Sequence, residues 1–408
     1  MRQMIRNRVW AGVLALLACG AMFAPAPGAM AGGLPRAQEK EAAKPAEAKD
    51  EKKGEKKEET LPMKPARKIE FTTDEGTWMS LDVSPDGSQI VFDLLGDLYL
   101  LPVAGGEAKR ITSGLPWDCQ PRFSPDGKEI AFISDRAGSD NVWRMNLASG
   151  KLVQVTKETE WQVGSPAWSP DGEYILARKF GVYPGPNDFL RGIALWMYHK
   201  DGGKGVEVVK GRGETTINSG AVYAPDGKTI YFSSHAERFR YDAPPGRFQV
   251  HSFDVKTGEI RSLTAEYGGG LRPVVSPDGR YLVYASRLDA ATGLRVRDLR
   301  TLEDHWLARD IQRDDQQGFA SDDVLPGYAF TPDSKAVVYT AGGKIHRVDV
   351  ASHAENVIPF SAKVELDLGP RVRTEYKIED GPLTVRQLKW MGQSPDGKSV
   401  VFSGVGKL

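Results

Sequence analysis

The sequence has few cysteines, no excess charge of either sign and only a short N-terminal apolar run. Its two cysteines, Cys19 and Cys119, cannot form a disulfide framework. Lysine plus arginine and aspartate plus glutamate both number 54, so the formal net charge is zero. A nucleic-acid-binding surface needs a basic excess. We therefore expect a fold held by its hydrophobic core, with no nucleic-acid partner and with Cys119 as a buried or half-buried structural thiol.

The motifs of two common enzyme classes are also missing. No Gly-x-Ser-x-Gly segment marks the nucleophile of a serine hydrolase. No Gly-x-x-x-x-Gly-Lys-Ser/Thr segment marks a phosphate-binding loop. We predict no catalytic residue and no cofactor in this chain.

The N-terminus has the three parts of a secretory signal peptide. Three arginines within the first eight residues form a basic region, and residues 9–18 are apolar but too short to span a bilayer as a stable helix. Ala29-Met30-Ala31 fits a small-x-small cleavage site. We predict a signal peptide over residues 1–31 and export to the periplasm or cell envelope.

A second processing site overlaps this segment. Leu16-Leu17-Ala18-Cys19 is close to a bacterial lipobox, in which Cys19 would be lipidated, although leucine at its second position is unusual. Lipidation of Cys19 is the only membrane contact that the sequence suggests. Export is expected with either form of processing.

Residues 32–66 are predicted to be a disordered charged linker. Between residues 36 and 60 there are eight basic and eight acidic side chains and no aromatic residue. Such a segment cannot bury enough apolar area to offset the loss of chain entropy on folding. We interpret it as a tether or a spacer.

A four-residue turn of the type Ser-Pro-Asp-Gly recurs along the rest of the chain. Successive copies lie 40 to 63 residues apart, which is the spacing of propeller blades. Proline presets the backbone at the second turn position, and aspartate and glycine suit the third and fourth. The aspartate is therefore interpreted as structural. The seven copies begin at Ser84, Ser124, Ser169, Ala224, Ser276, Thr331 and Ser394.

The residues around each turn predict short strands. In the second copy these strands are expected at 120–123, 129–134, 141–147 and 152–156. Four antiparallel strands make one blade, and blades must stack to bury their faces. We predict an all-β fold, a β-propeller of six to seven four-stranded blades over residues 67–408.

The two ends of residues 67–408 determine how the predicted propeller closes into a ring. Arg67 to Thr72 is predicted to be a strand that supplies the outer strand of the last blade. The last repeat reaches Leu408 at about its third strand, and a chain ending inside a blade leaves strand edges exposed. We expect the sequence to be the N-terminal part of a longer protein; alternatively, the strand at 67–72 completes a short last blade.

The turn and the apolar strand after it resemble the TolB-type propeller repeat, which also occurs in the propellers of prolyl oligopeptidases and tricorn-like proteases. Three further segments indicate a more specific resemblance: Phe71-Thr72-Thr73-Asp74-Glu75-Gly76-Thr77-Trp78, Phe92-Asp93-Leu94-Leu95-Gly96-Asp97-Leu98-Tyr99 and the stretch from Val364 to Trp390. They are similar to the start of large exported proteins in which TolB-like repeats precede an amidohydrolase domain. The resemblance covers residues 67–408.

The chain departs from that family at the metal site. An amidohydrolase uses several metal ligands that typically begin with His-x-His, and no such pair is present. We interpret the scattered histidines as surface or edge residues and predict no metal ligand among them: His199, His235, His251, His305, His346 and His353.

Two long loops are the candidate binding region. They join the second and third strands of the third and fourth repeats, so they are expected to form one wall on one face of the propeller. Aromatic and arginine side chains are favoured at recognition surfaces, and functional insertions often lie in such loops. Packing between the loops or on a further domain is the alternative. The candidate residues are Tyr183, Phe189, Arg191, Arg238, Arg240 and Tyr241.

Three functions remain open from the sequence. The first is that this is the propeller part of an exported hydrolase, resembling the amidohydrolases, in which it gates or orients substrate for a downstream catalytic domain. The second is a stand-alone, non-catalytic binding and scaffolding propeller with a protein partner. The third is the propeller of a prolyl-oligopeptidase-type peptidase.

Overall fold

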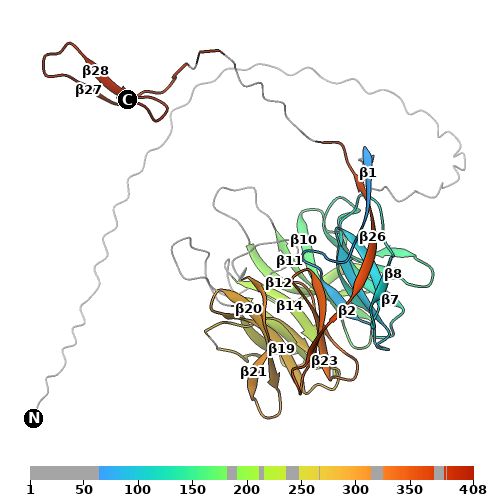
Figure 1. Ribbon diagram of the computed structural model, residues 1–408. Helices are drawn as coiled ribbons and strands as arrows, with labels where there is room; N and C mark the ends of the chain where they lie inside the picture. Colours follow the sequence, from blue (N-terminus) through green and yellow to red (C-terminus); the bar gives the residue numbers. More distant parts are fainter. Residues whose placement is uncertain are drawn as a thin grey trace, which may run out of the picture. The chain divides into compact units, whose positions relative to one another are not determined.

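The computed structural model describes residues 64–181, 191–210, 216–235, 248–265, 267–313, 325–371, 381–382 and 384–408. All regular elements in these ranges are β-strands, which confirms the all-β prediction (Figure 1). Within the same ranges, no helix is long and apolar enough to cross a bilayer.

Six of the seven repeated turns begin with Ser or Thr, and their side chains make the same hydrogen-bond pattern. In the first turn, Ser84 Oγ donates to Asp86 Oδ1 (2.6 Å) and accepts from Gln89 N (2.9 Å). Asp86 Oδ1 also accepts from Ser88 N at 3.0 Å. Gly87 has a φ of 71°, a left-handed conformation that glycine adopts readily. These bonds give the motif aspartate a structural role.

The second turn lies in a four-stranded antiparallel unit of order β6-β7-β8-β9. Its strands are β6 (Asp118–Phe123), β7 (Glu129–Ser134), β8 (Asn141–Asn146) and β9 (Leu152–Gln154), close to the predicted ranges. We call the four strands around one turn a turn unit, and we number the units by their turns. The strand before each turn is the inner strand of its unit.

Five more turns lie in units of the same strand order. Unit one is β2 (Leu81–Val83), β3 (Gln89–Leu94), β4 (Asp97–Pro102) and β5 (Gly106–Arg110), and unit three is β10 (Trp161–Trp168), β11 (Tyr174–Gly181), β12 (Arg191–His199) and β13 (Gly202–Val209). Unit four is β14 (Ile217–Tyr223), β15 (Thr229–His235), β16 (Gln249–Asp254) and β17 (Ile260–Ser262). Unit five is β18 (Leu271–Val275), β19 (Tyr281–Leu288), β20 (Ala291–Asp298) and β21 (Asp304–Arg313), and unit six is β22 (Ala329–Phe330), β23 (Ala336–Ala341), β24 (Lys344–Asp349) and β25 (Glu355–Ile358).

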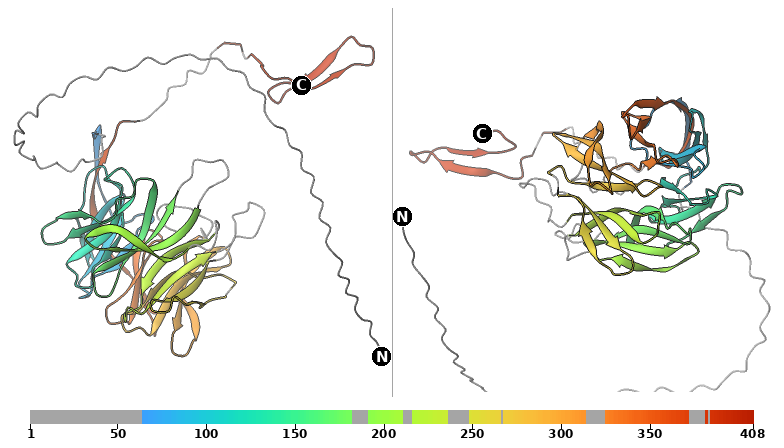
Figure 2. Two further views of the ribbon diagram at one scale, coloured as in Figure 1. Left: turned by 180° about the vertical axis from the view of Figure 1, so that it is seen from behind. Right: turned by 90° about the horizontal axis from the view of Figure 1, so that it is seen from below.

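The units are arranged around a common axis, as in a β-propeller (Figure 2). Inner strands of successive units contact one another, and β22 of unit six contacts β2 of unit one. One core cluster joins Phe92 of unit one to Val338 and Ile345 of unit six. Gly327 N, beside β22, donates to Ser80 Oγ at 3.0 Å, and Leu81 N donates to the Gly327 carbonyl at 3.0 Å. Core packing and hydrogen bonds thus connect the last unit to the first.

The edge of unit one carries two added strands. β26 (Phe360–Leu368), which follows unit six, pairs in parallel with β5, and β1 (Arg67–Thr73) pairs antiparallel with β26. The strand predicted at Arg67 to Thr72 therefore exists, but it does not join the last unit. The physical reason is that β26 buries Phe360, Ala362 and Val364 against unit one and presents a free edge that β1 covers.

The seventh turn lies in a separate two-stranded hairpin. Within the described residues, β27 (Lys389–Gln393) pairs with β28 (Val400–Ser403) alone. Every residue of β27 is exposed, as are Val400, Val401 and Phe402 of β28. The Ser394 turn nevertheless keeps the local pattern, because Ser394 Oγ donates to Asp396 Oδ1 at 2.5 Å.

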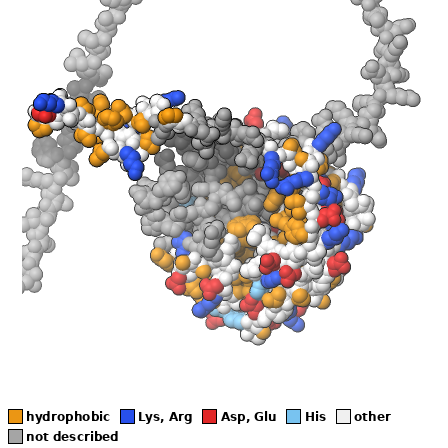
Figure 3. Space-filling view, turned by 45° about the horizontal axis from the view of Figure 1, so that its top comes forward, with side chains coloured by type: hydrophobic (Ala, Val, Ile, Leu, Met, Phe, Trp, Pro, Cys, Tyr) orange, Lys and Arg blue, Asp and Glu red, His pale blue; other side chains and the backbone are white. Residues whose placement is uncertain are grey.

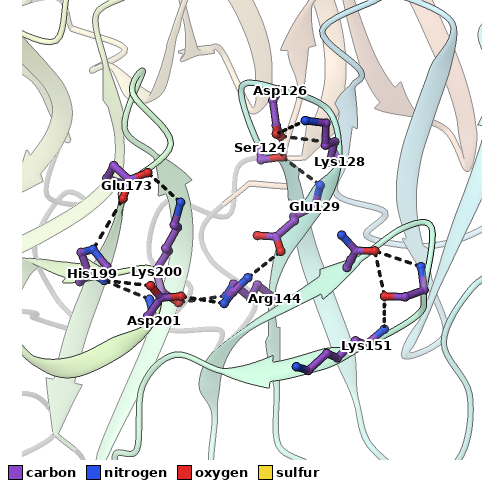
Figure 4. Close-up of polar contacts among 12 residues, drawn as sticks. Ser124, Asp126, Lys128, Glu129, Arg144, Lys151, Glu173, His199, Lys200 and Asp201 are labelled. Atoms are coloured by element: carbon purple, nitrogen blue, oxygen red, sulfur yellow. Dashed lines mark hydrogen bonds and ion pairs between the residues drawn. The ribbon is translucent and has the colours of Figure 1, made fainter.

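Polar contacts also link neighbouring units at the surface (Figure 4). Arg144 of unit two pairs with Glu129 of its own unit at 2.6 Å and with Asp201 of unit three at 2.8 Å. Lys200 pairs with Glu173 within unit three at 2.7 Å. Acidic and basic side chains are interspersed over the face shown in Figure 3. Exposed pairs of this kind stabilise a fold only modestly.

Candidate functional site

The residues predicted for binding belong to two loops that the structure does not describe. Five of them, Tyr183, Phe189, Arg238, Arg240 and Tyr241, lie in 182–190 and 236–247, outside the described residues. Arg191 begins β12, where its backbone pairs with Gly181.

The described residues instead enclose a cavity on the axis of the units, which we call the axial cavity. Its volume is about 420 Å³, and the inner strands of units one to six all contribute to its wall. Pro85, Pro125, Pro277 and Pro332 of the turns also line it, so it extends to the end that carries the turns. In each unit, the loop that joins the second and third strands begins at the other end of the second strand, away from the turn. In each unit, the residue two positions before the turn lines the cavity: Asp82, Arg122, Ala167, Val222, Val274 and Ala329.

Among the described residues, three charged side chains line the axial cavity, namely Asp82, Arg122 and Arg272. The rest of the lining is apolar or uncharged, with Trp168, Phe330 and the turn prolines among it. With both arginines and the aspartate ionised, the lining carries one net positive charge. The cavity is therefore suited to a ligand that combines apolar groups with one negative charge.

Arg122 projects from β6 between units one and six. Its Nη1 donates to the carbonyls of Leu81 and Tyr328, both at 3.3 Å, and lies 3.5 Å from Asp82 Oδ1. Burial lowers the pKa of Arg122, the Asp82 carboxylate opposes that shift, and the Arg272 charge adds to it. Burial raises the pKa of Asp82, and Arg122 opposes this shift.

Arg272 reaches the cavity because the inner strand of unit five has a bulge. The register of β18 against β19 shifts between Leu271 and Val274, and Arg272 has a φ of 48°. A bulge of this kind turns a side chain away from the regular alternation of a strand. Arg272 N donates to Ser233 Oγ of unit four at 2.7 Å, and the Arg272 carbonyl accepts from the Tyr328 hydroxyl.

The two guanidinium groups converge beside Gly327. A Cβ atom at Gly327 would lie 3.0 Å from Arg122 Nη2 and 3.1 Å from Arg272 Nη2. A side chain at this position would press on both guanidinium groups, which would have to shift by a few tenths of an ångström. Two arginines that are distant in the sequence thus come close to each other at Gly327, and both also line the axial cavity.

A smaller cavity of about 230 Å³ lies at the end of the inner strands away from the turns. Its lining includes Trp78, Trp117 and Gln120, together with Leu95 and Gly96 of the β3–β4 turn. Gln120 Oε1 accepts from Ser165 N of unit three at 2.6 Å. The side chain of Gln120 therefore helps to hold units two and three together.

Asp82, Arg122 and Arg272 were not predicted as binding residues from the sequence. A signal was present for the first two, because they stand where the other repeats have Ala167, Val222, Val274 and Ala329. A charged residue at a position that is otherwise apolar indicates a lined cavity rather than a packed core. Arg272 had no such signal, because its orientation depends on the bulge.

The histidines and the cysteine offer no chemistry at this site. Among the described residues, no group of three or more His, Cys, Asp or Glu side chains could hold a metal ion. Two histidines on neighbouring units, His305 and His353, stack with ring centroids 5.1 Å apart. Cys119 is buried, as predicted.

Comparison with known proteins supports the same architecture. A family described as the tricorn protease N-terminal β-propeller domain matches residues 82–181. Uncharacterized protein Atu1656 of Agrobacterium fabrum is 30% identical over 223 residues, which cover 53% of this chain and 68% of that protein. Uncharacterized peptidase YuxL of Bacillus subtilis is 27% identical over 216 residues, 50% of this chain and 29% of the peptidase. The chain thus spans less than a third of the length of that relative.

The crystal structure of TolB from Acinetobacter baumannii shares the fold. It superposes with a TM-score of 0.51 at 19% sequence identity, covering 70% of this chain and 65% of TolB. The repeated turn, the four-stranded units and these similarities define a β-propeller protein. The chain belongs to the same family as the Agrobacterium protein, and its propeller is of the TolB-like type.

Proposed function

We propose that this chain is a TolB-like propeller that binds a polypeptide segment in its axial cavity. The observation that carries the proposal is the cavity of about 420 Å³, which the inner strands of units one to six enclose together. Its volume falls within the range of about 300–1,000 Å³ that is usual for ligand sites. Its lining of aromatic, proline and arginine side chains is suited to an extended polypeptide.

The proposed propeller has six blades, which are the six turn units. β26 on the edge of unit one and the core cluster shared by units one and six favour a ring closed without the seventh turn. In this proposal the binding part of the chain is residues 67–371, and the hairpin of the seventh turn is an addition to it.

Location and partner follow from the same proposal. The signal peptide over 1–31 and the lipidation site at Cys19 lie outside the described residues, and we propose export to the periplasm or cell envelope from the sequence pattern alone. The partner would be a protein of that compartment. TolB likeness supports protein binding in general and does not define the partner.

A second candidate function is that the propeller serves a hydrolase. The Bacillus relative is named a peptidase, and this chain matches only 29% of its length, so similar propellers occur in larger proteins of that name. In this case the axial cavity would orient or gate a substrate for a catalytic domain of the peptidase or amidohydrolase type. The two candidates share the cavity as their binding region.

Filling the axial cavity should abolish peptide binding. Val222 lines the cavity on β14, and its replacement by Trp would place an indole across the space. We expect peptides selected from a random 12-residue phage library on the full-length protein to lose at least tenfold in affinity for Val222→Trp, because their binding space is occupied. Fluorescence anisotropy of the labelled peptides measures this loss.

The matched control is Val255→Trp, the same substitution at a residue of the β16–β17 turn that is 46% exposed. This variant should bind the selected peptides as the wild type does. Equal binding of the peptides to wild type, Val222→Trp and Val255→Trp would contradict the proposal.

A further inference from the structure

We propose that Arg122 and Arg272 form a receptor for one carboxylate group inside the axial cavity. This inference rests on the proposed function and gives the chemistry that the cavity recognises. Its basis is that Arg122 and Arg272, from different blades, both line the cavity, and that their guanidinium groups come close to each other beside Gly327.

The geometry brings two planar donor groups close to each other. Nη2 of Arg122 and Nη2 of Arg272 lie 3.0 and 3.1 Å from the position that a Cβ atom of Gly327 would occupy. A guanidinium group presents its donors in a flat fork that matches the two oxygens of a carboxylate. The absent side chain of Gly327 leaves room for both groups to approach the same point.

Arg122 retains donor capacity for a ligand. A guanidinium group has five N–H donors. Among the described residues, the hydrogen bonds of Arg122 all come from Nη1, at 3.3 to 3.5 Å, and are long for charged donors. The Nη2 and Nε groups are therefore the ones that a ligand would engage.

The charges of the cavity favour a single negative charge. Within the part of the chain that the structure describes, Asp82 is the only carboxylate that lines the cavity, against Arg122 and Arg272. Two like charges in a partly desolvated site repel each other, and a bound anion relieves that repulsion. One carboxylate neutralises the excess charge, whereas a phosphate dianion would leave the site net negative. We therefore infer a carboxylate rather than a phosphate.

Tyr328 holds the two arginines in place and is a positioning residue. Its carbonyl accepts from Arg122 Nη1 at 3.3 Å, and its hydroxyl donates to the Arg272 carbonyl. The tyrosine is 1% exposed, so its ring is fixed by packing. It belongs to unit six, which makes the site dependent on contact between units two, five and six.

The test uses the full-length protein and defined probes. The first probe is a Gly-Ser dodecapeptide with both termini blocked and one central Glu, and the second carries Gln in place of that Glu. Guanidinium Nε–Hε signals in ¹⁵N NMR spectra report binding at constant ionic strength. We expect the Glu peptide to bind at least tenfold more tightly than the Gln peptide and to shift the signals of Arg122 and Arg272.

Variants assign the effect to the two arginines. Arg122→Gln and Arg272→Gln should each remove the preference for the Glu peptide. Arg280→Gln is the matched control, because Arg280 pairs with Asp298 at 2.8 Å and is 43% exposed, outside the cavity. It should keep the preference. Equal binding of the Glu and Gln peptides, or a preference that survives in both cavity variants, would overturn the proposal.

If either cavity variant fails to fold, displacement of the Glu peptide from the wild-type protein tests the proposal instead. Sodium acetate should displace the Glu peptide and shift the same two arginine signals, whereas sodium chloride at equal ionic strength should not. No displacement by acetate counts against the receptor. A third peptide has Gln at the centre and a free C-terminus, so its only carboxylate is the terminal one. Its binding shows whether the receptor also takes a C-terminal carboxylate; either source of the carboxylate is consistent with the receptor.

The inference and the proposed function fail in different ways. If Val222→Trp abolishes binding of the phage-selected peptides but the Glu preference is absent, the cavity binds polypeptides without the carboxylate receptor. If acetate shifts the Arg122 and Arg272 signals but Val222→Trp leaves binding of the selected peptides intact, the receptor exists and the polypeptide proposal is wrong.

Discussion

Replacing Phe360 by Ala should lower the free energy of unfolding by about 3–5 kcal/mol, the range for truncation of a buried phenylalanine. Phe360 begins β26, is 5% exposed and contacts the ring of Phe92 edge-on with centroids 5.3 Å apart. Its core cluster also contains Val338 and Ile345 of unit six. The substitution therefore leaves a cavity where the first and last units meet. Unfolding of the purified protein in guanidinium chloride measures the change.

The control for this prediction is Val357→Ala on the neighbouring strand β25. Val357 is 49% exposed, so its truncation should change the free energy of unfolding by no more than about 0.5 kcal/mol. A loss below about 1 kcal/mol for Phe360→Ala would show that β26 does not pack on unit one as described.

The stability of the wild type should fall as the pH rises from about 4 to 7, and Asp97→Asn should make this fall smaller. Asp97 on β4 is 3% exposed and lies 3.3 Å from Arg110. Burial raises the pKa of Asp97 from 3.8 to about 7, Arg110 opposes the shift, and Asp118 adds to it.

The sign follows from proton linkage. The native state binds the proton of Asp97 more tightly than the unfolded chain does, so the stabilisation is complete below the unfolded pKa and is lost as the pH approaches 7. The raised pKa corresponds to a difference on the order of 4 kcal/mol across this window. The contribution of this group becomes constant only well above its native pKa of about 7.

Chemical unfolding at pH 4.5 and 7.5 measures this dependence. Asp86→Asn is the control, because hydrogen bonds from Ser84 and Ser88 lower the pKa of Asp86 to about 2. That group titrates below the window, so the control should keep the wild-type slope. If Asp97→Asn also keeps the wild-type slope, the proton is not held at Asp97.

The parts of the fold that depend on local chemistry could be predicted from the sequence. The turn motif specifies its own hydrogen bonds, as between Ser84 and Asp86, and the strands of the second unit fall within one or two residues of the predicted ranges. Alternating apolar residues predict strands because side chains on a strand point to opposite faces.

Long-range pairing could not be predicted in the same way. The sequence predicts a strand at 67–72, but its partner β26 lies almost 300 residues away, and nothing local to either strand specifies the pairing. The seventh turn has the same local chemistry as the others, yet its hairpin forms a two-stranded sheet. Local turn chemistry thus predicts a hairpin but does not decide whether that hairpin joins a larger sheet.

The candidate site was the least predictable part. Reasoning from loop length led to residues such as Tyr183 and Arg240, which lie outside the described residues. The axial cavity draws its charges from inner strands of different units. Arg122 could have been found from the sequence, because it is charged at a position where four of the six repeats have an apolar residue. The orientation of Arg272 depends on a bulge that the sequence does not predict.

The central claim is that the axial cavity is the binding site of this propeller. A crystal structure of the full-length protein bound to one phage-selected peptide tests it most directly. The account predicts peptide density inside the ring, in contact with Arg122, Val222 and Arg272. Density on an outer strand edge or on the outer surface of the blades, with the axial cavity unchanged, would contradict it.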